Sequence, residues 1–125
     1  MDTTRLFRNA DNVVTYEPGH VIFKEADPGD LMYAVLEGEV DIVVGDTVVE
    51  TIGVGGIFGE MALIDDGPRS ASARVKSTTR VVPVTAKRFM FLVEQTPFFA
   101  IHVMKLMSDR MRKMNRTLVT SARQC

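Results

Sequence analysis

The sequence predicts a mainly β domain, an all-β sandwich or barrel, followed by two helices. Three observations support this prediction. Short apolar runs separated by turn residues fill about residues 12–84, that stretch holds little helical periodicity, and helical periodicity begins near residue 86. The length of 125 residues fits one domain over residues 1–125 and can bury a real core.

Six apolar runs are the main strand candidates. A Pro18-Gly19 pair precedes the first run, and Gly45-Asp46 is typical of a tight hairpin turn between two others. Asp27-Pro28-Gly29-Asp30 is a further turn signal. The runs are Val21–Phe23, Leu31–Leu36, Val40–Val44, Thr47–Ile52, Ala71–Val75 and Arg80–Val84.

Composition points to a cytoplasmic protein. Apolar residues make up 46% and charged residues 25%, and no apolar run approaches the ~18 residues that a membrane helix needs. The start, Met1–Arg5, lacks the apolar segment of a secretory signal. Cys125 is the one cysteine, so a disulfide framework is excluded and a reducing compartment is expected.

Charge is unevenly distributed along the chain. Residues 1–66 carry 14 acidic and 3 basic side chains, a net of −11, whereas residues 67–100 and 101–125 each carry 1 acidic and 6 basic side chains, a net of +5. The basic C-terminal segment either packs beside an acidic body or offers a surface to an acidic partner.

The C-terminal part predicts two helices. Thr85 can cap a helix over about Ala86–Glu94. Thr96-Pro97 is a stronger start signal, because it places a capping hydroxyl before a proline at the first helical position. The second helix is expected to run from Pro97 to about Ala122.

A heptad-like apolar seam lies on the second predicted helix. Its members are spaced by 3, 4, 3 and 4 residues, a pattern typical of helix packing. The seam either packs on the helix's own domain or joins two copies in a homodimer. In a homodimer, the flexible methionine side chains would make the interface adaptable rather than rigid. It consists of Met104, Met107, Met111, Met114 and Leu118.

The segment over residues 53–72 contains the residues best suited to binding a ligand. Glu60 to Ile64 suits one helical turn, with glycines before it and Gly67-Pro68 after it, and a helix start attracts anions. Arg69 can fork onto two phosphate oxygens, and Ser70 adds a hydroxyl donor. Glu60 suits a sugar hydroxyl. From spacing alone, a nucleotide pocket and an ordinary surface loop both remain open.

Two runs in this segment resemble the phosphate-binding cassette of cyclic-nucleotide-binding domains. They are Phe58-Gly59-Glu60-Met61-Ala62-Leu63-Ile64 and Pro68-Arg69-Ser70-Ala71-Ser72. The family includes the bacterial catabolite activator protein, kinase regulatory subunits and nucleotide-gated channels. The likeness spans about residues 12–120. It implies a double-stranded β-helix, a jelly-roll-like β-roll over about 12–84, with a short phosphate-binding helix and two C-terminal helices over about 86–122.

The resemblance also implies roles for individual residues. Arg69 matches the arginine that pairs with the cyclic phosphate, and Glu60 matches the glutamate that accepts from the ribose 2′-OH. Gly59 and Ala62 match positions whose backbone faces the ribose and phosphate. Ser70 follows the arginine. The full expected site comprises Gly59, Glu60, Met61, Ala62, Arg69, Ser70 and Ala71, with Met111, Met114 and Asn115 as weaker candidates for contact with the base.

The function expected is a cyclic-nucleotide sensor rather than an enzyme. His20 and His102 lie far apart, and neither a metal-ligand cluster nor a catalytic triad is suggested. The run Arg69-Ser70-Ala71 looks like that of the bacterial activator, which favours cAMP over cGMP as the ligand, with no other cofactor. The alternative is a protein-interaction domain of the same fold that uses no nucleotide.

The expected output is movement of the last helix, over residues 97–122, which signals to a separate effector protein. The bacterial activator continues into a helix-turn-helix domain, whereas this sequence stops at Cys125. Direct reading of DNA by that route is therefore not expected.

Overall fold

A computed structural model gives the fold and describes residues 3–65 and 67–124, with side chains over residues 4–65 and 67–116. The chain divides into two compact units, one over residues 2–90 and the other over residues 91–125. The first unit contains both β-sheets, and helix α3 (Ala86–Gln95) runs from the first unit into the second.

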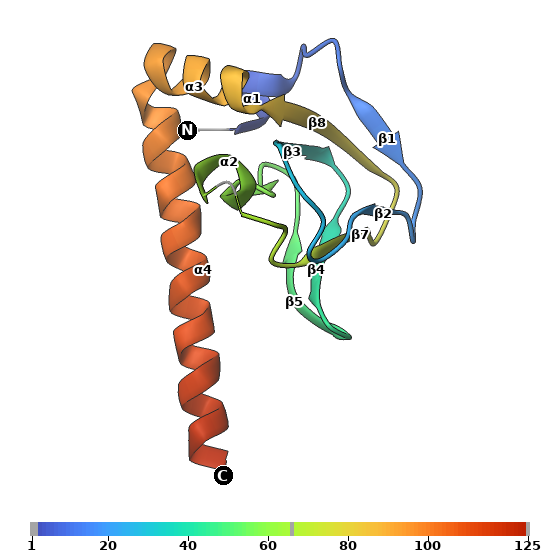
Figure 1. Ribbon diagram of the computed structural model, residues 1–125. Coiled ribbons are helices and arrows are strands. Elements are labelled where there is room, and N and C mark those ends of the chain that lie inside the picture. Colours follow the sequence, from blue (N-terminus) through green and yellow to red (C-terminus); the bar gives the residue numbers. More distant parts are fainter. Residues whose placement is uncertain (1–2, 66, 125) are drawn as a thin grey trace. The chain divides into compact units, whose positions relative to one another are not determined.

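The elements of the described chain follow the order that the sequence predicts, with β-strands first and two longer helices last (Figure 1). The N-terminal part consists of α1 (Thr3–Phe7), β1 (Val14–Tyr16), β2 (Val21–Phe23), β3 (Leu31–Glu37), β4 (Val40–Val44), β5 (Thr47–Ile52), β6 (Ile57–Phe58), α2 (Met61–Asp65), β7 (Ser72–Val75) and β8 (Thr79–Thr85). Helices α3 and α4 (Pro97–Gln124) follow.

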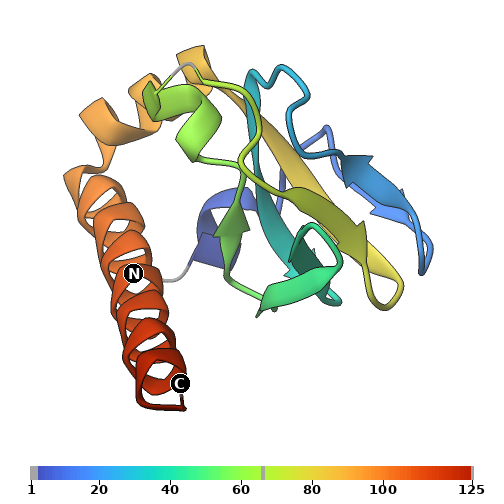
Figure 2. The ribbon, with the colours of Figure 1, turned by 60° about the horizontal axis from the view of Figure 1, so that its bottom comes forward.

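The strands of the described chain form two four-stranded sheets. Within each sheet, neighbouring strands pair antiparallel. One sheet has the strand order β1-β8-β3-β6 and the other the order β2-β7-β4-β5. Consecutive strands such as β1 and β2, or β3 and β4, lie in different sheets, so the chain winds from one layer to the other (Figure 2). This winding confirms the expected mainly β, jelly-roll-like architecture.

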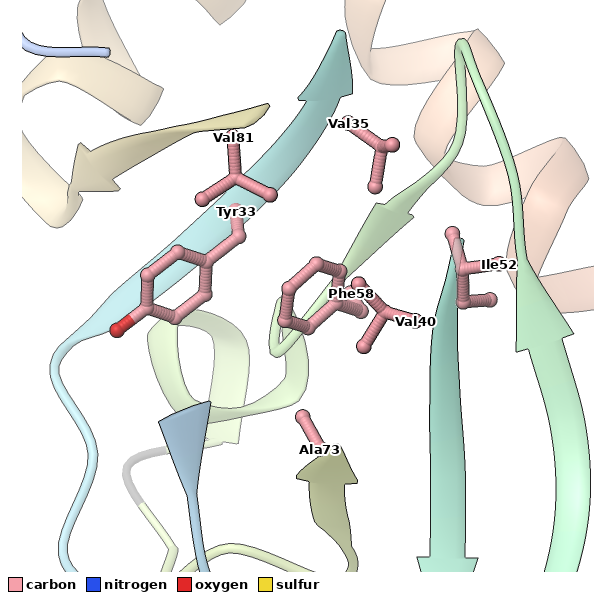
Figure 3. Packing of buried hydrophobic residues seen from close by; sticks show 7 residues of the cluster. All are labelled: Tyr33, Val35, Val40, Ile52, Phe58, Ala73 and Val81. Carbon is pink, nitrogen blue, oxygen red and sulfur yellow. The ribbon is translucent and has the colours of Figure 1, made fainter. Parts of the chain in front are cut away.

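A cluster of buried apolar side chains holds the two sheets together. Tyr33, Val35, Phe58 and Val81 come from the first sheet, and the side chains from both sheets point toward one another in Figure 3. The rings of Tyr33 and Phe58 stack, with centroids 5.1 Å apart. The second sheet contributes Val40, Ile52 and Ala73. Successive side chains of a strand point to opposite faces of a sheet, so Tyr33 and Val35 reach this core from the same face of β3.

The strand and helix boundaries agree closely with the patterns in the sequence. The hairpin at Gly45-Asp46 is confirmed by the pairing of Val44 with Thr47. The short helix α2 begins one residue later than predicted, because Glu60 precedes the first helical residue. Helices α3 and α4 begin at the predicted residues, Ala86 and Pro97.

The predicted cap of α3 is present. The hydroxyl oxygen of Thr85 accepts a hydrogen bond from the backbone N–H of Arg88 at 3.1 Å. This bond satisfies one of the N–H groups that a helix start leaves without an intrahelical partner. The β-to-α change at residues 85–86 is therefore encoded locally.

Three elements were not predicted, and one of them is strand β1, which precedes the first predicted apolar run at Val21–Phe23. Helix α1 lies before the apolar periodicity begins, and it buries Phe7 completely. Strand β6 has only two residues, both buried, and it pairs with Tyr33 and Ala34 of β3. Elements of two to five residues are too short for any periodicity to show, so tertiary contacts define them.

A buried threonine joins two turns at one end of the sheets. The Thr79 hydroxyl accepts from the Glu39 N–H at 3.1 Å. Its one hydrogen lies between two carbonyl oxygens, that of Ser77 at 2.7 Å and that of Glu39 at 3.1 Å, and the shorter distance favours donation to Ser77. Gly38, with φ of +88°, lies against this group, and a Cβ there would stand 2.4 Å from the Thr78 carbonyl oxygen. Gly38 is thus required for both backbone conformation and space.

We expect Gly38→Ala to lower the free energy of unfolding more than Gly19→Ala does. Gly19 has the same φ of +88°, but a Cβ added there would meet nothing within 4 Å, so its substitution incurs only the left-handed backbone strain, about 1–2 kcal/mol. Gly38→Ala adds a clash with backbone that cannot move away cheaply. Urea unfolding of both variants measures the difference. Equal losses would show that the contact with Thr78 and Thr79 is unimportant.

Candidate functional site

The predicted cassette forms one continuous stretch from strand β6 through helix α2 to strand β7. Gly59 connects the strand to the helix with φ of +77°, a left-handed conformation that glycine adopts without strain. Helix α2 packs against β3 (Figure 1), which ties the cassette to the first sheet. The loop after α2 then brings Arg69 back toward Gly59.

Arg69 is buried, with 7% of its surface exposed. Its Nη1 donates to the carbonyl oxygen of Gly59 at 2.9 Å, and its Nη2 donates to the carbonyl oxygen of Leu31 at 2.7 Å. The Nε is buried and makes no hydrogen bond within the described part of the chain. A guanidinium has five N–H donors, and these two bonds use one each, so the group keeps donors for an anion.

Charges around Arg69 favour its protonated form. Burial lowers the pKa of the Arg69 guanidinium, and the neighbouring Tyr33, Asp30, Asp27 and Glu60 raise it. Since arginine begins with a pKa far above neutrality, the side chain remains a cation. Burial also raises the pKa of the Tyr33 phenol, which keeps that hydroxyl neutral. The site is therefore a buried positive charge among acidic residues.

Glu60 is the second buried charged group, with 2% of its surface exposed. It precedes α2, and its carbonyl oxygen accepts from the N–H groups of Leu63, at 3.0 Å, and Ile64, at 3.3 Å. Glu60 also belongs to the charges that raise the pKa of Arg69. The segment from Glu60 to Arg69 thus buries both an acidic and a basic side chain.

The other predicted residues of the cassette differ in exposure. Ala62 is buried, Met61 is 48% exposed, Ser70 is exposed and Ala71 is half-buried. Strand β7 begins only at Ser72, so Ser70 and Ala71 lie in the loop rather than at the start of the strand.

The weaker candidates lie on α4, in the second unit. Met111 and Met114 are 63% and 66% exposed, and Asn115 is also exposed. Of the remaining seam residues, Met104 is 59% exposed and Met107 is half-buried. The side chain of Leu118 lies outside the described residues. Contact of these residues with a base remains a prediction.

Sequence reasoning missed the residues that surround Arg69 from a distant part of the chain. Phe23, Gly29 and Leu31 all contact its guanidinium or lie within reach of it. In the sequence they read only as a strand end, a turn and a strand start. They precede Arg69 by about forty residues, and no local motif joins the two segments.

The described residues contain neither a cluster of metal ligands nor a helix that could span a membrane. No group of three or more His, Cys, Asp or Glu side chains there could hold a metal ion. Within the same part of the chain, no helix combines the length and apolar character needed to cross a membrane.

Known proteins are similar to this chain in both sequence and fold. The model of the cyclic nucleotide-binding domain family matches residues 13–96. The crystal structure of the catabolite activator protein of Thermus thermophilus is similar with a TM-score of 0.76 and 28% identity, over 89% of this chain and 55% of that one.

Two curated relatives are similar in sequence. The CRP-like cAMP-activated global transcriptional regulator of Mycobacterium tuberculosis is 26% identical over 110 residues, which cover 84% of this chain and 49% of the relative. The cGMP-dependent protein kinase of Plasmodium berghei is 32% identical over 82 residues, 66% of this chain and 10% of the kinase. The chain thus spans about half the length of the regulator and a small part of the kinase. With its two-sheet fold and its buried Glu60 and Arg69, it belongs to the cyclic nucleotide-binding domain family.

Proposed function

We propose that this chain is a sensor module that binds a cyclic nucleotide, with cAMP preferred over cGMP, and that it catalyses no reaction itself. The observation that carries the proposal is the buried Arg69, which is held by two backbone carbonyls and keeps its Nε without a hydrogen bond within the described chain. A buried cation with unused donors is suited to an anion such as a cyclic phosphate.

The phosphate contacts of the proposal come from Arg69 and from the start of α2. Arg69 pairs with the cyclic phosphate through its remaining N–H groups. The first N–H groups of a helix lack intrahelical partners. At the start of α2 the Ala62 N–H already donates to the Gly59 carbonyl oxygen at 3.4 Å, so the proposal takes the Met61 N–H as the backbone donor for the phosphate. In the proposal, the exposed residue Ser70 supplies a further hydroxyl donor, and the half-buried Ala71 lies next to it.

The ribose contact of the proposal is Glu60. A carboxylate accepts from the ribose 2′-OH, whereas it would repel the phosphate. Gly59 and Ala62 place backbone beside the same sugar. Charge-assisted hydrogen bonds of this kind are the stronger class, so Glu60 contributes to both affinity and choice of ligand.

The preference for cAMP rests on Arg69-Ser70-Ala71, which looks like the corresponding run of the bacterial activator. The similar regulator of Mycobacterium tuberculosis is described as cAMP-activated, which supports the same preference. The similar kinase of Plasmodium berghei is described as cGMP-dependent, so both nucleotides belong in the test. Met111, Met114 and Asn115 are proposed to contact the base.

The signal is proposed to pass through α4 to a separate effector protein. A ligand that binds one placement of this helix better than another shifts the population toward it. The exposed methionines of α4, Met104, Met111 and Met114, are suited to an adaptable contact with a second copy of the chain. The competing function is a protein-interaction domain of the same fold without a nucleotide.

The first test is calorimetric titration of the wild type and of Arg69→Ala with cAMP, cGMP and AMP. We expect cAMP to bind most tightly and AMP weakly. Loss of a buried charge pair costs about 2–5 kcal/mol, so Arg69→Ala should weaken binding by about 30-fold to 4,000-fold. Thermal unfolding of the variant is the control for its fold. Absence of binding by the wild type would favour the interaction domain.

A second test addresses the ribose contact. We expect Glu60→Gln to weaken cAMP binding by about fivefold, because a neutral acceptor is about 1 kcal/mol weaker than a charged one. The same substitution should leave the affinity for 2′-deoxy-cAMP unchanged, since that ligand has no 2′-OH. Calorimetry with both ligands measures this. An equal loss for the two ligands would contradict the proposed role of Glu60.

A third test addresses the seam on α4. If the seam joins two copies, the wild type sediments as a dimer and the double variant Met107→Glu, Met114→Glu as a monomer, because buried like charges oppose association. Analytical ultracentrifugation with and without cAMP measures the mass. A wild type that is monomeric in both conditions would contradict the homodimer.

A further inference from the structure

The backbone at Arg69 is fixed by the turn between β2 and β3. The N–H of Arg69 donates to the carbonyl oxygen of Asp27 at 2.8 Å, and the N–H of Ala26 donates to the carbonyl oxygen of Arg69, also at 2.8 Å. Both the N–H and the carbonyl of Arg69 are therefore bonded to the β2–β3 turn, as in a pair of antiparallel strands. The turn itself is closed by the Asp27 carboxylate, which accepts from the Lys24 N–H at 3.0 Å.

The guanidinium of Arg69 lies on an aromatic ring from the same segment. Its Cζ stands 4.0 Å from the centroid of the Phe23 ring, a cation–π contact. That ring is held in turn by Tyr33 and Phe58, with centroid distances of 6.0 Å to each. Since these two rings belong to the core between the sheets, the surface under Arg69 is rigid.

Gly29 lies so close to the guanidinium of Arg69 that no side chain fits between them. A Cβ built on Gly29 would stand 2.4 Å from Arg69 Nε and 2.6 Å from its Cζ. The φ of Gly29 lies outside the left-handed region, so another residue can adopt its backbone conformation. Space for the arginine, rather than conformation, is therefore the reason for glycine at this position.

We propose that Phe23, Gly29 and Leu31 form an arginine cradle that sets the guanidinium of Arg69 in its binding orientation before a ligand arrives. The ring of Phe23 supports it, the carbonyl of Leu31 orients Nη2, and Gly29 leaves room for Nε and Cζ. Arginine has many rotamers, and a side chain fixed in advance loses less entropy on binding. The cradle residues are positioning residues, and the inference rests on the proposed role of Arg69.

The test compares Gly29→Ala with a matched control, Gly53→Ala. Gly53 also lies outside the left-handed region, and a Cβ there meets nothing within 4 Å. In calorimetric titrations with cAMP, we expect Gly29→Ala to weaken binding about tenfold or more, since a displaced guanidinium loses charge-assisted bonds. Gly53→Ala should bind as the wild type does.

A double-mutant cycle separates positioning from a general loss of structure. In the Arg69→Ala background, we expect Gly29→Ala to have no further effect on affinity, because the side chain that the cradle orients is absent. An equal loss in both backgrounds would overturn the cradle. If Gly29→Ala binds cAMP normally while Arg69→Ala does not, the cradle fails and the proposed function stands. If Arg69→Ala binds normally, both fail.

A readout without ligand covers the case in which Gly29→Ala is too unstable to titrate. In the wild type we expect a distinct, slowly exchanging NMR signal from the buried Nε–H of Arg69. Phe23→Leu keeps the site apolar but removes the ring face, so it should shift or lose that signal and weaken cAMP binding. An unchanged signal together with unchanged affinity in Phe23→Leu would overturn the proposal.

Discussion

The buried guanidinium of Arg69 connects the cassette to the rest of the first unit through its hydrogen bonds. Arg69 cannot be removed from water without partners, and it finds them in the backbone carbonyls of Gly59 and Leu31. These carbonyls come from two different segments, the cassette and the start of strand β3. One side chain therefore joins segments that are about ten and forty residues away along the chain. The loop that carries Arg69 is consequently anchored to the first sheet.

The two-sheet fold makes this anchoring possible. Because the chain alternates between the sheets, the β2–β3 turn and the cassette meet at one end of the sandwich. The stacked rings of Phe58 and Tyr33 form part of the core, and Phe23 extends that aromatic group to the guanidinium. The core and the candidate site are thus physically continuous. Phe23 is the residue that links the two, since it contacts both the core rings and the guanidinium.

In the folded protein, some acidic residues of the N-terminal half lie near the buried Arg69. The sequence carries its acidic excess in residues 1–66, and several of those acids, Asp27, Asp30 and Glu60, raise the pKa of Arg69. They offset part of the electrostatic cost of burying a guanidinium that is already protonated at neutral pH. The acidic body of the chain therefore supports a buried cation, an arrangement that the net charge of −1 conceals.

The mainly β architecture, the starts of α3 and α4, and the stretch proposed as the cassette could all be predicted from the sequence. These features are local: turn glycines, a capping threonine before residue 86, and a contiguous run from Phe58 to Ile64. The residues that surround Arg69, in contrast, become known only from the folded chain. Gly29 reads as an ordinary turn glycine, and Phe23 as the end of a strand. Contacts between segments about forty residues apart depend on how the sheets wind, and no periodicity or spacing within one segment records that.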